Sequence, residues 1–373
     1  MSRSLLIISF SRIVEDARVL KQVNLFTSRY DVTTVGYGPA PDGVVAHHEI
    51  PETLVAWHKD RRALLVRRFG EVQRRSAVVR HLRAVLPVGE HDVVLANDAD
   101  TVPLALFLRP RQGVHADLHE YAPRENEESW RWRLFVAPYY RWLCEEFVTR
   151  AASVTTVGDG LAREYRKEFG IVADVVPNAA PFHELVPTPV HRPIRLVHSG
   201  NARRNRALGL MVDAVARTRA DVTLDLYLMP NDPGYLVELR EQVAQVPGVT
   251  LHDPVPYVRL VKTLNDYDIG VFVLPPVTFN YAWTLPNKFF DYVQARLGVI
   301  IGPSPEMVGL TTEHGLGVVT EDFTADALAA SLDTLDPTTV SGWKTASDGV
   351  ARELSAEQQS HGWVDAVAAL MNA

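Results

Sequence analysis

The sequence is poor in the residues and patterns that stabilise secreted domains or cross membranes. Cys144 is the only cysteine among 373 residues, which excludes an internal disulfide and a cysteine-based zinc site. No apolar run approaches the roughly 18 residues of a membrane span, and Ser-Arg-Ser at residues 2–4 precedes a strand-like run rather than a signal sequence. We therefore expect a cytoplasmic protein.

Common motifs of cofactor and metal sites are absent as well. No G-x-G-x-x-G follows a predicted strand and no G-x-x-x-x-G-K-S/T occurs, which argues against an ordinary dinucleotide site and a P-loop. His119-Glu120 lacks a second histidine at position 123, where Pro123 stands, so it is no zinc-protease motif. Asp98-Ala99-Asp100 resembles the metal-binding acid pair of single-domain sugar transferases, but two acids in so short a span are common by chance. We expect neither a metal nor a cofactor.

What is present is an alternation of apolar runs and helical patterns in both halves of the chain. The predicted strands of the first half are 4–10, 31–36, 93–96, 113–118, 153–157 and 171–176. Those of the second half are 194–198, 222–229, 249–252, 269–274 and 299–301. Strands separated by helices favour parallel sheets covered on both faces, and the chain is longer than one core usually supports. The sequence thus predicts an α/β fold with two doubly wound domains, whose ligands bind beyond the carboxyl ends of the strands.

A proline-rich stretch divides the two halves. Residues 177–193 hold five prolines and no periodicity, which is typical of a linker. We predict four segments: an N-terminal domain over 1–180, a linker over 181–193, a second domain over 194–350 and a terminal helical segment over 351–373.

An arginine-rich loop follows the strand 194–198. Gly200 is expected to form a tight turn there, and Arg203, Arg204 and Arg206 precede a helix. Guanidinium groups and backbone N–H groups that converge at the carboxyl end of a strand suit an anion, above all a diphosphate. The alternative is a solvated basic loop.

A helix of the same half begins near Pro286, a residue suited to a first helical turn. Apolar residues follow at helical spacing, and Gly298 is expected to end the helix. The N-terminal amides of this helix and Lys288 are candidates for binding the same anion, and Asp291 for binding the hydroxyl groups of a sugar. Alternatively, Asp291 only complements the helix dipole.

Polar residues also follow two strands of the first half. His119 and Glu120 come directly after the strand 113–118, where a histidine either acts on a substrate or has a structural role. Asn97 and Asp98 end the neighbouring strand and either bind acceptor hydroxyls or begin the next helix, which Asp100 is expected to cap.

Residues 57–83 form a basic segment, with nine Lys or Arg against two acids, and a long helix is predicted over 60–86. Arginine pairs at 67–68 and 74–75 flank an apolar stripe. Such helices dock on anionic lipid or on acidic partners, and the alternative is a solvated helix packed on the sheet. Nucleic acid is not expected, because the segment lacks interleaved aromatics and the chain carries a net charge of −7.

Two segments carry a resemblance to a known family. The spacing from Gly200 to Arg206, and PNKFFDYVQARLGVI at 286–300, resemble the donor-site motifs of GT-B-fold glycosyltransferases of the GT4 type, also called glycosyl transferases group 1. EDARVLKQ at 15–22 and SAEQQSHGWVDAVAALM at 355–371 resemble the first and terminal helices of that family, and His119-Glu120 its His-Glu element. Trp283 departs from the pattern, which has an acid there, and Ser9-Phe10-Ser11-Arg12 replaces a glycine-rich loop.

The resemblance implies two Rossmann-like domains facing a cleft, with a C-terminal helix that crosses back to the first domain. It implies retaining, metal-independent transfer of a sugar from a UDP- or GDP-linked donor to a hydroxyl of a glycan, lipid-linked or small-molecule acceptor, as in polysaccharide biosynthesis, either in the cytoplasm or at the inner membrane face. The implied roles are catalytic for His119 and Glu120, diphosphate-binding for Gly200, Arg203, Arg206 and Lys288, nucleotide- and ribose-binding for Pro286, Asn287 and Asp291, and acceptor-binding for Asn97 and Asp98. A nucleotide-sugar epimerase and a non-enzymatic nucleotide-sugar-binding protein are the alternatives.

Overall fold

The computed structural model describes residues 3–373. Its chain forms two compact units, each with its own parallel sheet. Unit 1 comprises the residues up to Pro177, Thr278–Asn280 and Ser360–Ala373, and unit 2 comprises Asn178–Val277 and Tyr281–Gln359. No helix within residues 3–373 is both long and apolar enough to cross a membrane.

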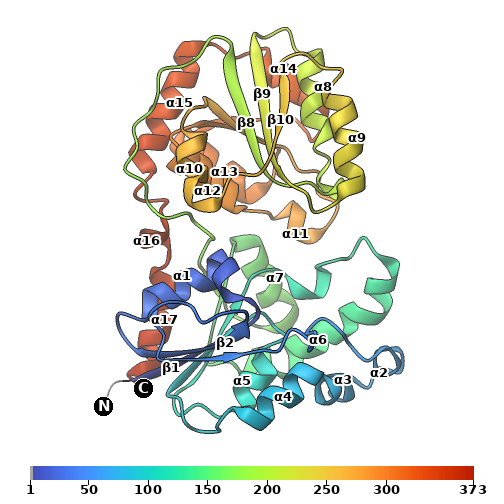
Figure 1. The fold of residues 1–373 in the computed structure, drawn as a ribbon, viewed down its shortest axis with the longest axis vertical. Helices are drawn as coiled ribbons and strands as arrows, with labels where there is room; N and C mark the ends of the chain where they lie inside the picture. The colour runs from blue at the N-terminus through green and yellow to red at the C-terminus, as the bar shows by residue number, and fades with distance from the viewer. Residues whose placement is uncertain (1–2) are drawn as a thin grey trace. The chain divides into compact units, whose positions relative to one another are not determined.

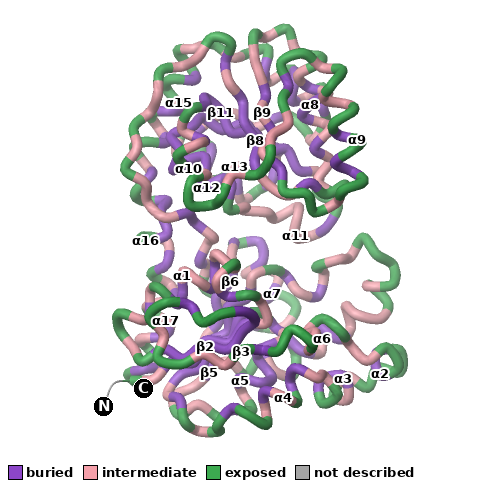
Figure 2. Tube along the Cα trace, in the orientation of Figure 1, coloured by how far each residue is buried: buried purple, intermediate pink, exposed green. Residues whose placement is uncertain are grey.

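Unit 1 is built on a seven-stranded sheet with the order β3-β2-β1-β4-β5-β6-β7, in which every pair is parallel. The strands are β1 (Ser4–Arg12), β2 (Asp31–Tyr37), β3 (Ala46–Glu49), β4 (Val93–Asn97), β5 (Gly113–Leu118), β6 (Ser153–Thr156) and β7 (Asp174–Val175). The central strands are apolar runs without alternation, as expected of a sheet buried on both faces. Figure 2 shows this sheet as a buried layer.

Helices cover both faces of the unit 1 sheet (Figure 1). They include α1 (Ala17–Phe26), α5 (Val102–Phe107), α6 (Ala137–Glu146), α7 (Asp159–Phe169) and α17 (His361–Met371). The side chain of Asp16 caps α1 by accepting hydrogen bonds from two backbone N–H groups of its first turn. From α17, Trp363 and Val367 join Leu5 and Ile7 of β1 in one buried cluster. The C-terminal helix therefore belongs to the first unit, as predicted.

The single long helix predicted over 60–86 is wrong. The structure has three short helices instead: α2 (Arg61–Leu65), α3 (Phe69–Arg75) and α4 (Ala77–Val85). Arg67 has a positive φ of 55°, which ends the first of them. The side chain of Ser76 caps α4 by accepting a hydrogen bond from the Val79 N–H, so a capping residue inside the predicted helix starts a new one.

Unit 2 has a six-stranded parallel sheet with the order β10-β9-β8-β11-β12-β13. Its strands are β8 (Ile194–Asn201), β9 (Val222–Met229), β10 (Val249–His252), β11 (Ile269–Phe272), β12 (Gly298–Ile301) and β13 (Gly317–Val319). The helices α8 (Gly209–Arg217), α9 (Pro233–Val243) and α14 (Ala325–Leu332) pack in one apolar cluster, and α10 (Tyr257–Leu264), α12 (Asn287–Gln294) and α13 (Pro305–His314) pack in another. The helices α15 (Pro337–Val350) and α16 (Ala356–Gln359) complete the unit.

Two local predictions for unit 2 are corrected by the structure. Gly200 lies within β8, not in a turn after it, and the chain turns at the 3-10 helix Arg204–Arg206. Gly298 does not end α12 but starts β12. The helix ends after Gln294, where Arg296 takes a φ of 63° and its buried guanidinium donates to the carbonyls of Gln294 and His183. Arg296 thus takes the left-handed conformation that glycine often takes at a helix end, and its hydrogen bonds satisfy carbonyls there.

Candidate functional site

Polar side chains gather at the carboxyl ends of the central strands in both units. In unit 2 they come from the end of β8, from the turn that follows it and from the first turn of α12. In unit 1 they come from the residues that end or follow β4 and β5.

Lys288 is the central residue of the unit 2 group. It lies in the first turn of α12 and is buried, with its ammonium 4.7 Å from the centre of the Phe272 ring. Gly200 makes room for it, since a Cβ at this position would lie 2.7 Å from Lys288 Nζ. Gly200 also has a φ of +149°, which side chains disfavour. The glycine is therefore required by its backbone conformation, and a side chain at this position would also displace the Lys288 ammonium.

The charges near Lys288 are mostly positive. The pKa of Lys288 is lowered to about 7, mainly by burial and also by the Arg206 guanidinium, whereas Asp291 opposes the change. His198, on β8, donates from Nδ1 to the Val271 carbonyl at 2.8 Å. Burial, together with Lys288 and Arg206, holds the pKa of His198 well below its usual value. The histidine is thus neutral, and the excess of cationic groups favours an anion at this position.

Two buried nitrogens of this group have no hydrogen-bond partner within residues 3–373. They are Nε2 of His198 and Nε of Arg206. The Arg206 guanidinium lies 5.6 Å from the centre of the Tyr281 ring, which holds it in the group. Buried polar atoms are normally satisfied. Nε of Arg206 is a donor and indicates a ligand atom that accepts hydrogen bonds or carries negative charge. Nε2 of the neutral His198 ring, whose proton is on Nδ1, is an acceptor and indicates a ligand group that donates.

The neighbouring arginines of the loop do not join this group. Arg204 makes two hydrogen bonds of 2.7 Å to Glu238 on α9. Arg203 is exposed, and its side chain has no hydrogen bond or ion pair with any residue that the structure describes. Of the predicted diphosphate residues, the structure brings together Gly200, Arg206 and Lys288 but not Arg203.

The predicted nucleotide residues lie at the start of α12. Pro286 has an extended ψ of 154° and is the capping residue, so the helix begins one residue later, at the exposed Asn287. Asp291 is buried, and its charge acts on Lys288 and on Tyr257, whose pKa is raised mainly by burial and also by Asp291. A carboxylate in this position does more than complement an exposed helix dipole. Its contact with a ribose stays a prediction.

His119 is the central residue of the unit 1 group. Its Nε2 lies 3.0 Å from Oδ1 of Asn97 and 3.3 Å from Oδ2 of Asp117, and its Nδ1 lies 3.4 Å from Oδ2 of Asp98. Both ring nitrogens thus face oxygen acceptors, which only the doubly protonated ring satisfies. Burial lowers the pKa of His119, but Asp98 and Asp117 outweigh it, and the net pKa is raised. The structure therefore unites His119, Asn97 and Asp98 around an imidazolium.

Asp117, on β5, is a member of this group that the sequence analysis missed. It is fully buried and accepts hydrogen bonds from Arg18 Nε at 2.8 Å and Nη2 at 2.7 Å, and from Gln22 Nε2 at 2.7 Å. It also accepts from Thr155 Oγ1 at 2.7 Å and Trp363 Nε1 at 3.2 Å. Burial raises the pKa of Asp117, but Arg18 and His119 outweigh burial and hold it well below the usual value.

A signal for Asp117 was present in the sequence. In HADLHE, at the end of β5, Asp117 and His119 are two residues apart, and side chains at this spacing point to the same face of an extended chain. A carboxylate inside an otherwise apolar run needs a buried partner. Arg18, in the segment EDARVLKQ of the first predicted helix, is that partner.

Two other acids of unit 1 have different surroundings from those expected. Asp100 does not cap α5, because its carboxylate accepts from the Tyr140 hydroxyl at 2.7 Å and lies 3.5 Å from Lys59 Nζ. That interpretation was wrong. Glu120 is exposed and accepts from Asn280 Nδ2 at 3.4 Å.

No cluster of three or more His, Cys, Asp or Glu side chains within residues 3–373 is arranged to hold a metal.

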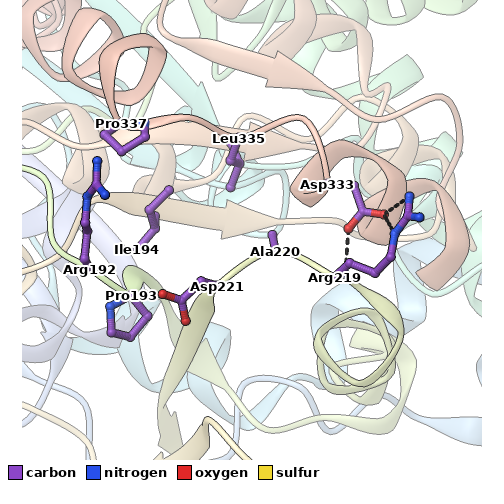
Figure 3. Close-up of a pocket in the computed structure, with 9 residues that line it drawn as sticks. All are labelled: Arg192, Pro193, Ile194, Arg219, Ala220, Asp221, Asp333, Leu335 and Pro337. Atoms are coloured by element: carbon purple, nitrogen blue, oxygen red, sulfur yellow. Dashed lines mark hydrogen bonds and ion pairs between the residues drawn. The ribbon is translucent and has the colours of Figure 1, made fainter.

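A pocket of about 400 Å³ lies at the opposite end of the unit 2 sheet, where β8 and β9 begin (Figure 3). It is lined by the segments 192–194 and 219–221 and by Asp333, Leu335 and Pro337. Arg219 and Asp333 hydrogen-bond to each other across one side of it. None of the predicted site residues lines this pocket, and it lies away from the carboxyl ends of the strands.

Comparisons with known proteins show the fold. No family profile and no curated protein matches the chain. HepE of Anabaena, crystallised with UDP and glucose, matches over 98% of this chain and 100% of its own with a TM-score of 0.71 at 13% identity. A glycosyltransferase from Rickettsia africae matches over 99% of both chains (0.70, 11%), and sucrose-phosphate synthase of Thermosynechococcus elongatus over 98% and 100% (0.70, 13%). The predicted GT-B fold is confirmed: two parallel-sheet α/β units with a C-terminal helix.

Proposed function

We propose that this GT-B chain is a glycosyltransferase of the GT4 type, which moves a sugar from a nucleotide-sugar donor to an acceptor hydroxyl. The observation that carries the proposal is the buried cationic group of unit 2, in which Lys288 and Arg206 lie beside Gly200 and His198. A nucleoside diphosphate is the ligand class that such a group fits, because it is polyanionic and accepts many hydrogen bonds.

The cationic group would also contribute to the chemistry. When the bond between the sugar and the β-phosphate breaks, negative charge develops on the leaving diphosphate, and positive groups already in place stabilise it. A diphosphate next to Lys288 would raise the pKa of this ammonium and keep it charged. In this proposal the protein cations supply the positive charge that a metal supplies in other transferases, and the sugar is transferred with retention.

Unit 1 is proposed to act on the sugar and the acceptor. The His119 imidazolium would donate hydrogen bonds to hydroxyl groups of the transferred sugar, and Asn97 and Asp98 would bind acceptor hydroxyls. Asp117 touches neither in this scheme. It acts as a positioning residue, because it fixes the ring of His119 while Arg18 and Trp363 fix its carboxylate.

The comparisons support UDP-glucose as the first donor to test, because HepE was crystallised with it. We would measure the thermal unfolding of the chain with UDP-, GDP-, ADP- and dTDP-sugars. A ligand at about 100 times its dissociation constant stabilises by about 2.7 kcal/mol, so a donor gives a clear rise in Tm. We expect this rise to vanish in Arg206→Ala.

The matched control is Arg204→Ala, on the same turn but paired with Glu238. We expect it to keep the rise in Tm. Loss of the rise in both variants, or no rise with any nucleotide sugar, would contradict a donor site at this group. A labelled donor then separates the alternatives: release or transfer of the sugar supports a transferase, isomerised nucleotide sugar supports an epimerase, and binding alone supports a non-enzymatic protein.

A further inference from the structure

We propose that unit 1 docks on an anionic lipid bilayer through the surface around α2. We call this surface the α2 patch, formed by Arg61, Arg62, Leu65, Val66, Arg67 and Arg68. The proposal goes beyond the proposed transferase and does not rest on it. The α2 patch covers only residues 61–68, a small part of the basic helix predicted over 60–86.

The centre of the α2 patch is apolar and exposed. Leu65 is 63% exposed and Val66 is 61% exposed, although their neighbours Ala63 and Leu64 are buried. This segment therefore buries Ala63 and Leu64 in the core and exposes the adjacent Leu65 and Val66 to solvent. Trp57, just before the helix, is 72% exposed.

Four arginines surround this aliphatic pair, two on each side in sequence. Arg61, Arg62, Arg67 and Arg68 are all exposed, and none forms an ion pair with a residue that the structure describes. The next arginines along the chain differ, because Arg74 pairs with Glu71, and Arg75 pairs with Asp60 at 2.8 Å. The positive charge of the α2 patch is thus uncompensated, while the charge beside it is neutralised.

A second element extends the exposed apolar surface. The π-helix Trp132–Val136 contacts α2, and beside this contact Trp130 and Leu134 are 56% and 54% exposed. The guanidinium of Arg131 lies 5.5 Å from the centre of the Trp130 ring. Aliphatic, tryptophan and arginine side chains from two segments therefore occupy one region of unit 1.

This composition fits a bilayer surface better than other polyanions. Guanidinium groups bind lipid phosphates, aliphatic side chains enter the boundary between headgroups and acyl chains, and tryptophan favours that boundary. Nucleic acid would gain little from Leu65 and Val66, because bases stack on aromatic side chains rather than aliphatic ones. An acidic protein partner would meet the arginines but needs no protruding aliphatic pair.

The test is sedimentation of the full chain with vesicles of phosphatidylcholine alone and of phosphatidylcholine with phosphatidylglycerol. We expect binding only to the anionic vesicles. Each arginine near such a surface contributes about 1 kcal/mol, or about fivefold in affinity, so Arg62→Gln with Arg68→Gln should weaken binding by about 25-fold. The matched control is Arg29→Gln with Arg240→Gln, which removes the same charge from exposed arginines elsewhere and should leave binding unchanged.

A second pair of variants tests the apolar part. Leu65→Glu with Val66→Glu should abolish vesicle binding, and Val237→Glu with Val258→Glu, at exposed valines of unit 2, should weaken it much less. Three results would overturn the proposal. They are an equal loss of vesicle binding in both arginine double variants, equal binding to neutral and anionic vesicles, and binding to heparin but not to vesicles. Nucleotide-sugar stabilisation measured on the same variants is expected to be unchanged, which separates this surface from the donor site.

Discussion

The two sheets have the same parallel architecture, but the charges at their carboxyl ends differ in sign. In unit 1, Asp98 and Asp117 surround a histidine whose pKa they raise. In unit 2, Arg206 and Lys288 surround a histidine whose pKa is lowered, first by burial and then by these cations. In the proposed function, the common fold determines where a ligand binds and a few side chains determine which ligand it is: hydroxyl groups in unit 1 and a diphosphate in unit 2.

The largest effect is expected from removing the carboxylate of Asp117. Asp117→Ala leaves Arg18 buried without its partner, and breaking such a buried pair costs about 3–5 kcal/mol. Chemical denaturation would measure this loss of the free energy of unfolding.

The matched control for Asp117 is the buried pair of unit 2, in which Asp268 lies 3.1 Å from Lys344 Nζ. Asp268→Ala should destabilise by a similar amount, but only Asp117→Ala should lower the pKa of His119, because Asp268 has no contact with that group. NMR titration would measure the pKa of His119 in each variant. A fall of this pKa in both variants would contradict a specific positioning role for Asp117.

An intermediate effect is expected from removing the central cation of unit 2. Charged hydrogen bonds contribute about 1.5–3 kcal/mol, so Lys288→Met should weaken nucleoside diphosphate binding by about 10- to 100-fold, as measured by calorimetry. Because burial lowers the pKa of Lys288 to about 7, the unfolded chain binds more protons between about pH 7 and the normal lysine pKa near 10.5. The free energy of unfolding should therefore rise with pH in that range.

Lys288→Met should reduce this rise, because methionine has no proton to lose. The same variant should unfold about as easily as the wild type at pH 7, since removing the desolvated ammonium offsets the loss of its attraction to the buried Asp291. A less stable variant with unchanged nucleotide affinity would mean that Lys288 is a structural residue and not a ligand-binding one.

The smallest effect is expected from Asp98, which is more exposed than Asp117. Asp98→Asn should lower the pKa of His119, because it removes one of the two charges that raise it. A raised pKa stabilises the folded state at low pH, and this contribution is lost as the pH rises through the folded pKa. The variant should therefore lose stability at pH 5 relative to pH 8. Unchanged NMR titration of His119 would contradict this account.

Much of the fold was predictable, because strands and helices alternate in the sequence and the central strands are unbroken apolar runs. The α2–α4 segment was not, since its breaks depend on Arg67 adopting a positive φ and on Ser76 capping a new helix. Gly200, Arg206 and Lys288 could be found from their spacing. Asp117 was missed, because its partners Arg18 and Trp363 lie far away in sequence and only folding brings them together.

Trp363 has a consequence for how the protein is made. Its indole donates to Asp117, and the Arg18 guanidinium lies 4.6 Å from the centre of its ring. During synthesis, which folds chains from the N-terminus onward, Asp117 and Arg18 leave the ribosome before all of unit 2, and Trp363 leaves after it. The hydrogen bonds around Asp117, which positions His119, therefore stay incomplete until unit 2 has been synthesised. By then the nascent chain already contains Arg206 and Lys288, the cations of unit 2.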